Sequence, residues 1–370
     1  MLTLPIASFL SAVLSLLPLP HSWQARNVPV LSLATWLFVL NLCQGVNSII
    51  WLSNYETEGT LWCDISTKLN IGAMSAIPAS VFCISKYLEL VSSQRASKLL
   101  PVSGWRSKFL DMFLCLCLPI VLMALHFVVQ ERRYDIIENI GCVPATFNAI
   151  PSILVVYLVP FLLIFGTFIY AAIAFHHFLR HRATFGTHIR CLDSTLTTAS
   201  YFRLYVTSIT FVGILVASTV LSLITMLSSP MHQRTHWSHV DLNLWSIMTY
   251  SVDDLPKATI RMLYALWWVV PTLGYLLSLF LSFGQENIAL YQKALDLLRT
   301  KFTRRPLSEK EYVNHISIVY DLLIICSRIQ FVSTTHRHSQ TFNSRCQDRL
   351  VSRQHATIHA NHRLSCVHAH

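Results

Sequence analysis

The sequence predicts an all-α integral membrane fold, a bundle of seven transmembrane helices. Three observations lead to this prediction: the composition, a series of seven apolar stretches, and the charge of the segments between them. The 370-residue chain is 53% hydrophobic and only 12% charged, whereas about 25% of the residues of a soluble domain are charged. So many apolar side chains indicate a surface that faces lipid rather than water.

The seven apolar stretches lie within residues 1–285, which we interpret as one seven-transmembrane domain. Each has roughly the 20 residues with which a helix crosses the ~30 Å hydrocarbon core of a bilayer. Because lipid offers the backbone no hydrogen-bond partners, each stretch is expected to be helical. The stretches comprise residues 2–20, 28–52, 63–93, 109–130, 151–179, 204–228 and 262–285.

The first stretch is interpreted as a span and not as a cleaved signal peptide, because residues 1–20 contain no basic residue. Several later spans contain proline, which leaves a backbone carbonyl without its usual donor. Neighbouring helices and Ser/Thr side chains can supply a donor in a bundle. The prolines are therefore expected to kink the helices for packing or, alternatively, to act as hinges of a conformational change. They are Pro78, Pro119, Pro160 and Pro271.

The charge of the connecting segments predicts the orientation. With the N-terminus outside, the inner segments before residue 285 carry nine Lys and Arg against one acid, and the outer segments carry five against eight acids. Basic residues gather on the cytoplasmic side of membrane proteins. We therefore expect an outer N-terminus, a cytoplasmic C-terminus and a multi-pass protein of the plasma membrane. The net charge of +10 then reflects inner segments facing anionic lipid, and no nucleic-acid partner is implied.

The pattern changes twice after the seventh span. Residues 286–302 place apolar side chains three and four residues apart among basic ones, which indicates an amphipathic helix on the inner leaflet. Residues 303–370 are polar, rich in Ser, Thr and His, and resemble nothing familiar. We expect this segment to be a mostly disordered cytoplasmic tail.

Two cysteines lie where an oxidising compartment would meet them. Cys63 stands at the outer start of the third span, and Cys142 lies in the loop between the fourth and fifth spans. A disulfide between them would tie that loop across the outer end of the bundle; the alternative is two unpaired thiols. The spacing of the other cysteines and histidines predicts no metal site, and no cofactor is expected.

Ionisable and strongly polar residues within membrane spans are candidates for ligand contact. Asn47, Lys68 and His126 all fall in the outer third of the predicted bundle. Lys68 has a second interpretation. Asp64 lies one helical turn above it, so the two residues could simply form an internal ion pair.

Aromatic residues and arginines mark the two ends of the bundle. Tyr264 and Trp267 open the seventh span from the outer side, where they either contact a ligand or belong to an interfacial aromatic belt. The opposite end is basic, and its arginines either orient the protein against lipid headgroups or form a docking surface for a cytoplasmic partner. These arginines are Arg26, Arg95, Arg182, Arg190 and Arg203.

The sequence lacks the features that are typical of several function classes. A cation transporter usually needs carboxylates at mid-depth, whereas Glu89 and Asp111 lie near the predicted inner boundaries. No Gly-rich phosphate loop, HExxH or GxSxG motif occurs, so an enzyme is not indicated. A seven-helix receptor is the favoured class, and a seven-span transporter or channel is the alternative.

Several motifs lie at defined places along these spans. The main ones are PLPHSWQARN at 18–27, QGVNSIIW at 44–51, WCDISTK at 62–68, MALHFVVQ at 123–130, IGCVPATFN at 140–148 and YFRL at 201–204. With them, the chain resembles the fungal mating-pheromone receptors of the a-factor (lipopeptide) type, the class D G-protein-coupled receptors. The resemblance covers about residues 5–290.

The resemblance implies a receptor for a prenylated, carboxymethylated peptide pheromone that signals to a heterotrimeric G protein. A homodimer of the receptor is a further expectation. It includes the outer-loop residues 133–135, so Tyr134 and Asp135 join the candidate ligand contacts. Two departures are present. Lys68 stands where related receptors often carry arginine, which keeps the charge but changes the geometry, and the sixth span lacks the usual proline. A non-mating orphan receptor stays open as an alternative.

Overall fold

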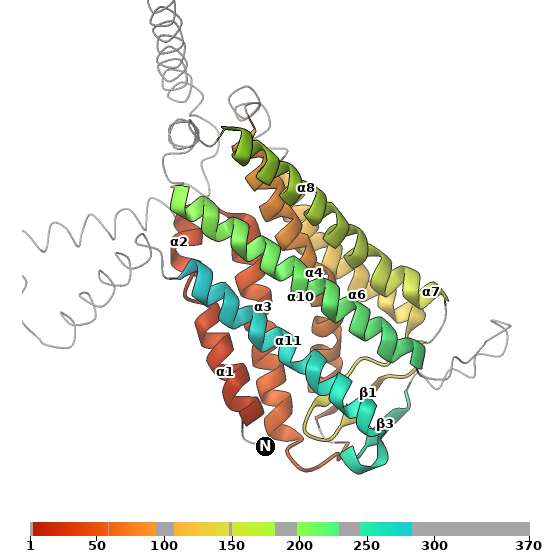
Figure 1. Cartoon of the computed structure of the whole chain (residues 1–370). Helices are drawn as coiled ribbons and strands as arrows, with labels where there is room; N and C mark the ends of the chain where they lie inside the picture. The colour runs from red at the N-terminus through yellow and green to blue at the C-terminus, as the bar shows by residue number, and fades with distance from the viewer. Residues whose placement is uncertain are drawn as a thin grey trace, which may run out of the picture. The chain divides into compact units, whose positions relative to one another are not determined.

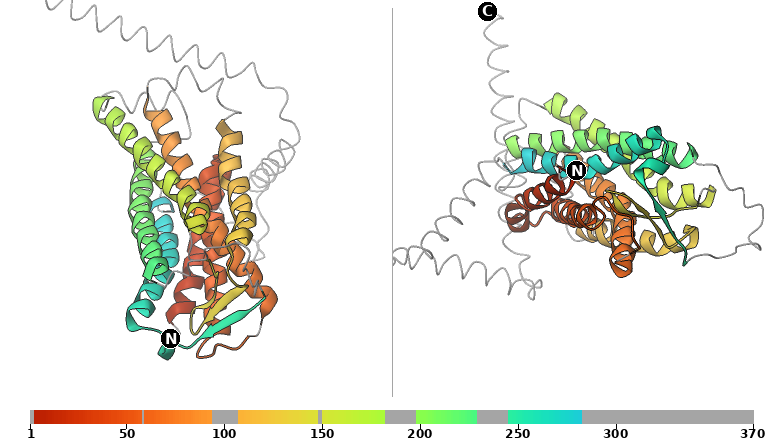
Figure 2. Two further views of the ribbon diagram at one scale, coloured as in Figure 1. Left: turned by 90° about the vertical axis from the view of Figure 1, so that its right-hand side faces the viewer. Right: turned by 90° about the horizontal axis from the view of Figure 1, so that it is seen from below.

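The computed structural model describes residues 3–57, 59–93, 107–147, 150–181, 198–228 and 245–282. Seven helical segments among them are long and apolar enough to cross a membrane, which confirms the predicted seven-helix architecture (Figures 1 and 2). The expectations for residues 286–302 and 303–370 lie outside the described residues. The outer position of the N-terminus stays a prediction.

Most spans consist of one long helix, and the fourth and fifth contain a π-helical segment within their first half. In chain order the elements are α1 (Thr3–Ser15) with α2 (Leu19–Gln24), α3 (Val28–Ile50), α4 (Thr60–Ser92), η1 (Phe113–Cys117) with α6 (Leu118–Val129), α7 (Ile150–Ser152) with η2 (Ile153–Leu158) and α8 (Val159–His181), α10 (Thr198–Ser228) and α11 (Lys257–Leu281). The sixth and seventh helices begin earlier than predicted, because polar residues extend them beyond the apolar stretch.

Helix α4 is the central helix of the described bundle. It packs against α3, α6, α8 and α10, and Figure 1 shows it between the other helices. Leu88 of α4 lies in the main apolar core with Leu33 and Leu37 of α3, Phe211 of α10 and Leu277 of α11, all five with no exposed surface. Its buried residues also include small hydroxyl side chains, and those of Ser75 and Ser80 donate to backbone carbonyls of the same helix.

The outward faces of the peripheral helices are apolar as well. Phe161, Phe165 and Phe168 follow the 4,3 spacing of one helix face on α8, and they are 57%, 55% and 60% exposed. A soluble protein rarely leaves such a continuous apolar surface in water. This surface fits a lipid environment.

Side chains of α3 reach the carbonyls that two prolines leave without an α-helical donor. Pro119 has no N–H for the carbonyl of Cys115, and the Ser32 hydroxyl donates to that oxygen at 3.5 Å. Pro271 likewise offers no N–H to the carbonyl of Trp267, and the Gln44 amide donates there at 3.5 Å. The expected rescue of proline-freed carbonyls by neighbouring helices is present at these two positions.

A three-stranded sheet at one end of the bundle adds to the predicted helices. Its strands are β1 (Tyr134–Ile137), β2 (Gly141–Val143) and β3 (Ile247–Tyr250), in the order β2-β1-β3. β1 and β2 form an antiparallel hairpin, and β3 pairs with β1 in parallel. Strands of three and four residues in polar loops carry too little alternation to be predicted.

The sheet joins two loops that are distant in the sequence. β1 and β2 belong to the loop between the fourth and fifth spans, and β3 precedes the seventh span, with Tyr134 opposite Ile247 and Ile137 opposite Tyr250. The N-terminus of the chain lies near these strands (Figure 2). We call this end of the bundle the sheet end and the other the opposite end.

Candidate functional site

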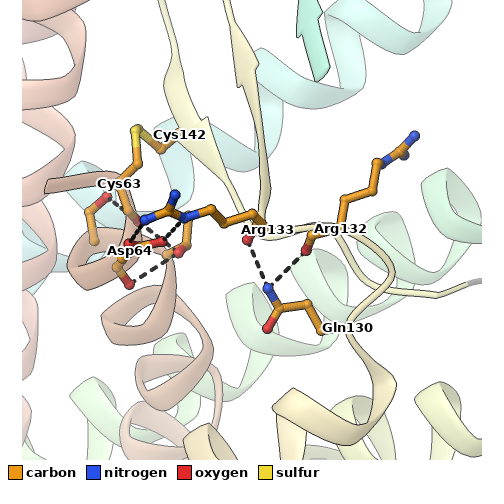
Figure 3. A network of polar contacts seen from close by, with 8 residues as sticks. Cys63, Asp64, Gln130, Arg132, Arg133 and Cys142 are labelled. Atoms are coloured by element: carbon orange, nitrogen blue, oxygen red, sulfur yellow. Dashed lines mark hydrogen bonds and ion pairs between the residues drawn. A yellow bond between two sulfur atoms is a disulfide. The ribbon is translucent and has the colours of Figure 1, made fainter. Parts of the chain in front are cut away.

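A disulfide ties the sheet to the first turn of α4. Cys63 of α4 is bonded to Cys142 of β2, with the Cα atoms 5.4 Å apart (Figure 3). This is the pairing that the sequence suggested. Both cysteines lie in an apolar cluster with Trp51, Tyr134 and Ile136. The sheet is therefore held on the bundle by a covalent bond and by apolar packing.

Asp64 and Arg133 form a two-point ion pair beside this disulfide (Figure 3). The Arg133 Nε atom lies 2.9 Å from Oδ1 of Asp64 and its Nη2 atom 2.5 Å from Oδ2. The guanidinium also lies 5.7 Å from the ring centroids of Tyr134 and Trp245. The hydrogen bonds to Asp64 raise the pKa of Arg133.

This ion pair overturns the suggested pairing of Asp64 with Lys68. Both carboxylate oxygens of Asp64 accept hydrogen bonds from Arg133, whose planar guanidinium matches a carboxylate better than an ammonium does. The i,i+4 spacing on α4 made the Lys68 pairing possible, but an arginine from the neighbouring loop takes the carboxylate.

Lys68 contacts the end of the fourth span instead. Its Nζ atom donates to Oε1 of Gln130 at 2.7 Å and lies 3.2 Å from Nδ1 of His126. The other ring nitrogen of His126 lies 3.0 Å from the Thr146 hydroxyl. The Lys68 ammonium also lies 5.9 Å from the ring centroid of Phe127. Two of the predicted site residues, Lys68 and His126, are thus in direct contact.

Gln130 links this contact to the loop that carries the sheet. It follows α6 as its C-terminal cap residue, and its amide nitrogen donates to the carbonyls of Arg132 and Arg133 at 2.8 and 2.9 Å (Figure 3). The side chain of Lys68 and the start of the sheet loop are therefore held by the same amide group.

Tyr134 and Asp135 are both in β1. The Tyr134 side chain is buried, and its hydroxyl has no hydrogen-bond partner within the described ranges; burial raises its pKa. Burial also raises the pKa of Asp135 to about 6, against the attraction of Arg132, whose Nε atom lies 3.4 Å from the carboxylate. Asp135 is therefore partly protonated in mildly acidic surroundings.

Asn47 and Tyr264 contact the hairpin turn between β1 and β2. The Asn47 side-chain oxygen accepts from the Trp62 indole at 2.7 Å. Gly141 approaches it so closely that an added Cβ would lie 2.6 Å from the Asn47 Cβ, and Gly141 has φ +89°. The Tyr264 hydroxyl interacts with the side chain of Asn139 in the same turn. Both candidates therefore bind the chain's own loop.

Trp267 makes a separate set of contacts. It is 4% exposed, its ring centroid lies 5.3 Å from that of Trp268, and its carbonyl accepts from Gln44 of α3. Its indole N–H has no partner in the part of the chain that the structure describes. The aromatic residue lies between helices and is not a simple interfacial belt residue.

Two of the five candidate arginines at the opposite end fall on described residues. Arg26 is exposed between α2 and α3 with φ 50°, and Arg203 donates from Nη2 to the Ser200 hydroxyl at 3.0 Å. Arg95, Arg182 and Arg190 lie outside the described residues.

Sequence reasoning missed three residues that hold the site together: Gln130, Arg133 and Thr146. Their partners lie 62, 69 and 20 residues away in the sequence, and nothing in their local pattern predicts such contacts. The available signal for Arg133 was its charge beside Tyr134 and Asp135. Among the described residues, no group of three or more His, Cys, Asp or Glu could hold a metal ion.

Comparison with known proteins shows one consistent likeness. A family model described as "Pheromone A receptor" matches residues 3–301. The chain is 36% identical to the Pheromone B beta 1 receptor of Schizophyllum commune over 306 residues, which are 82% of this chain and 56% of that protein. It is 28% identical to Pheromone receptor 1 of Ustilago hordei over 334 residues, 88% of this chain and 91% of that protein.

A more distant likeness is to the Pheromone a factor receptor of Saccharomyces cerevisiae, 26% identical over 304 residues that cover 79% of this chain and 62% of that protein. The chain spans only about half the length of the Schizophyllum beta 1 receptor and a third of the Pheromone B alpha 3 receptor of the same species.

Proposed function

The chain belongs to the Pheromone A receptor family, and on that premise we propose that it is a receptor for a prenylated mating-type peptide that activates a heterotrimeric G protein. The match over residues 3–301 carries this proposal, because it includes every described helix and strand. The seven membrane-spanning helices make it a multi-pass membrane protein.

The sheet end is proposed as the ligand-binding side. It carries Lys68, His126, Tyr134 and Asp135, together with a disulfide that holds the sheet over the first turn of α4. An isoprenoid tail would partition into lipid or an apolar crevice with about 0.8 kcal/mol per buried CH₂. The peptide part would then meet the sheet and its loops at the membrane surface.

The opposite end is proposed as the G-protein side. The positive-inside distribution supports a cytoplasmic location for Arg26, Arg95, Arg182, Arg190 and Arg203. A ligand shifts a receptor towards an active state only by as much as it binds that state better. The pheromone must therefore contact residues at the sheet end whose arrangement differs between the two states.

The proposal is tested by expressing the full chain in a fungal strain that lacks its own pheromone receptor and contains a G-protein-dependent reporter. A panel of synthetic prenylated peptides should include one that activates the reporter in the nanomolar to micromolar range. The same peptide without its prenyl group should be much weaker. No response to any peptide, with the protein present at the cell surface, would contradict the proposal.

Variants at the two ends separate binding from coupling. Lys68→Ala should weaken the response by about tenfold or more, which is the effect of losing one charge-assisted hydrogen bond. Lys257→Ala, exposed at the start of α11, is the matched control and should respond normally. Arg203→Ala should reduce signalling while labelled pheromone still binds. Solute flux through proteoliposomes that contain no G protein would favour the alternative of a transporter or channel.

A further inference from the structure

Lys68 differs from Lys86, Arg132 and Arg133 in having no ion pair with an acid among the residues that the structure describes. Lys86 pairs with Asp111, Arg132 with Asp135, and Arg133 with Asp64. The direct partners of Lys68 are the side-chain amide of Gln130, the imidazole of His126 and the ring of Phe127. None of these groups carries a negative charge.

The neighbouring groups confirm that this charge is not balanced by a direct contact. Asp64, the nearest acid on α4, is engaged through both oxygens by Arg133. If the Lys68 ammonium donates to Nδ1 of His126, the ring proton is on Nε2, which then donates to Thr146, and the imidazole is neutral. The charge of Asp64 acts on Lys68 only from a distance. A partly buried ammonium without an acid in direct contact is costly in a membrane protein, so the site attracts an anion.

The position of the ammonium limits what this anion can be. Lys68 begins about 12 Å below the start of α4, eight residues from Thr60 at 1.5 Å per residue. Its side chain nevertheless reaches Gln130, the residue that caps the end of α6. Lysine side chains near helix ends extend in this way towards the lipid headgroups. The ammonium therefore lies where a membrane span ends, at the level of lipid phosphates.

The side of Lys68 that faces away from the bundle is apolar. Leu61 and Ile65 lie seven and three residues before it on the same face of α4 and are 72% and 48% exposed. Phe127, whose ring contacts the ammonium, is 62% exposed on α6. Gln130 and His126 are instead tied to the sheet loop. A cation bordered by exposed apolar side chains on membrane-spanning helices fits a lipid rather than a water-soluble anion.

We propose that Lys68 binds the phosphate group of a phospholipid in the leaflet at the sheet end, with the acyl chains lying over Leu61, Ile65 and Phe127. Free inorganic phosphate has the same charge chemistry but cannot use the apolar side of the site. The same lysine is a candidate pheromone contact in the proposed function, but the inference concerns binding without pheromone or G protein, so the two proposals succeed or fail in separate experiments.

The test measures phospholipid that stays with the purified protein. The full chain is reconstituted with phosphatidylcholine and phosphatidylserine, re-extracted in a maltoside detergent that contains no phosphorus, and washed, and bound phospholipid is then quantified by mass spectrometry. Wild type and Lys68→Arg should retain phospholipid. In Lys68→Met the amount of bound phospholipid should fall by about tenfold or more. The control Lys257→Met removes an exposed lysine at the same end and should behave as wild type.

A second variant and a competition experiment test the apolar side of the site and the kind of anion it binds. Ile65→Gln leaves Lys68 and its polar partners in place, so it tests the apolar half even if Lys68→Met does not fold, and it should lower retention severalfold. Excess inorganic phosphate should not displace the lipid. Equal retention by wild type, Lys68→Met and Ile65→Gln would overturn the proposal. Displacement by inorganic phosphate would also overturn it, in favour of a free-anion site.

Discussion

Helices α4 and α11 both cross the bundle with an internal proline, Pro78 in one and Pro271 in the other, but they are held differently. The sheet end of α4 is bound by a disulfide and an ion pair to the sheet loop. Helix α11 is held in its middle, where Gln44, Asn41 and Ser11 donate to the carbonyls of residues 267, 270 and 271.

The difference indicates which helix can change shape. The bonds of α4 join it to another segment through side chains and a covalent link, so its sheet end cannot move without the sheet. The bonds of α11 are made by side chains of α1 and α3 to backbone carbonyls around a proline, where the helix has lost one of its own hydrogen bonds. Helix α4 is therefore fixed at its sheet end, and we expect Pro271 to be the point at which α11 can bend.

The largest expected effect is on the fixed helix. Cys63→Ser should lower the stability of the protein by about 2–5 kcal/mol, because the unfolded chain is no longer closed into a loop. Thermal unfolding in detergent, with and without reductant, measures this. Cys117→Ser, at an exposed free cysteine, is the control. If Cys63→Ser and reduced wild type melt like oxidised wild type, the disulfide does not fix α4.

A smaller loss is expected where α11 meets α1. A Cβ added at Gly274 would lie 2.1 Å from the Ser11 hydroxyl, so Gly274→Ala must displace this hydroxyl from its bond to the Pro271 carbonyl or move the helices, and it should cost about 1–3 kcal/mol. Gly213 on α10 has nothing within 4 Å of an added Cβ, and Gly213→Ala should be neutral or slightly stabilising. The two melting temperatures, measured side by side, test whether the close approach of α1 and α11 is required. A Gly274→Ala protein as stable as Gly213→Ala would show that it is not.

Asp135 should make the stability of the sheet depend on pH. Its pKa is raised to about 6 in the folded protein, above the ordinary value of about 3.9, so the folded state binds the proton more tightly than the unfolded state. The stability contributed by this proton is present below about pH 4 and is lost as the pH rises through 6.

Asp135→Asn should therefore stabilise the protein at pH 7 by about 1–2 kcal/mol and have little effect at pH 4. Melting curves at both pH values measure the difference. Asp253→Asn, at an exposed position in η4 (Val252–Asp254), should change neither. If Asp135→Asn were less stable than wild type at pH 7 and equally stable at pH 4, the predicted sign would be wrong.

The smallest effect is expected at the Asp64–Arg133 pair. Their side chains are 37% and 27% exposed, and water weakens such pairs, so a double-mutant cycle with Asp64→Asn and Arg133→Gln should give a coupling of about 0.5–1 kcal/mol. Arg133→Lys should lose most of it, since the second hydrogen bond disappears. A coupling near zero would leave the disulfide as the main attachment of α4 to the sheet loop.

The sequence predicted the features that depend on local pattern or on simple topology. The seven spans followed from their length and apolar composition, and the Cys63–Cys142 pairing followed from which cysteines fall at one end of the bundle. The similar depth of Lys68 and His126 in the bundle also followed from counting residues along the spans, whereas their direct contact was not predicted.

The features that were missed depend on contacts between distant segments. The parallel pairing of β1 with β3 brings Tyr134 opposite Ile247, and such a pairing leaves no mark in either short strand. Asp64 had two possible partners, and the choice of Arg133 depends on where the loop after the fourth span places a guanidinium. The ion pair of Asp64 could therefore be assigned only once the fold of the distant loop segments was known.

The anchoring of α11 at Pro271 has a mechanical consequence. From Pro271 to the last helical residue, Leu281, the helix extends about 15 Å at 1.5 Å per residue. If Pro271 serves as a fulcrum, a rotation of about 10° over this lever arm displaces the Leu281 end by about 3 Å. A rotation of the sheet end of α11 would thereby reach the opposite end as a side-chain-sized displacement, measured against α4, which is held at its sheet end by the disulfide.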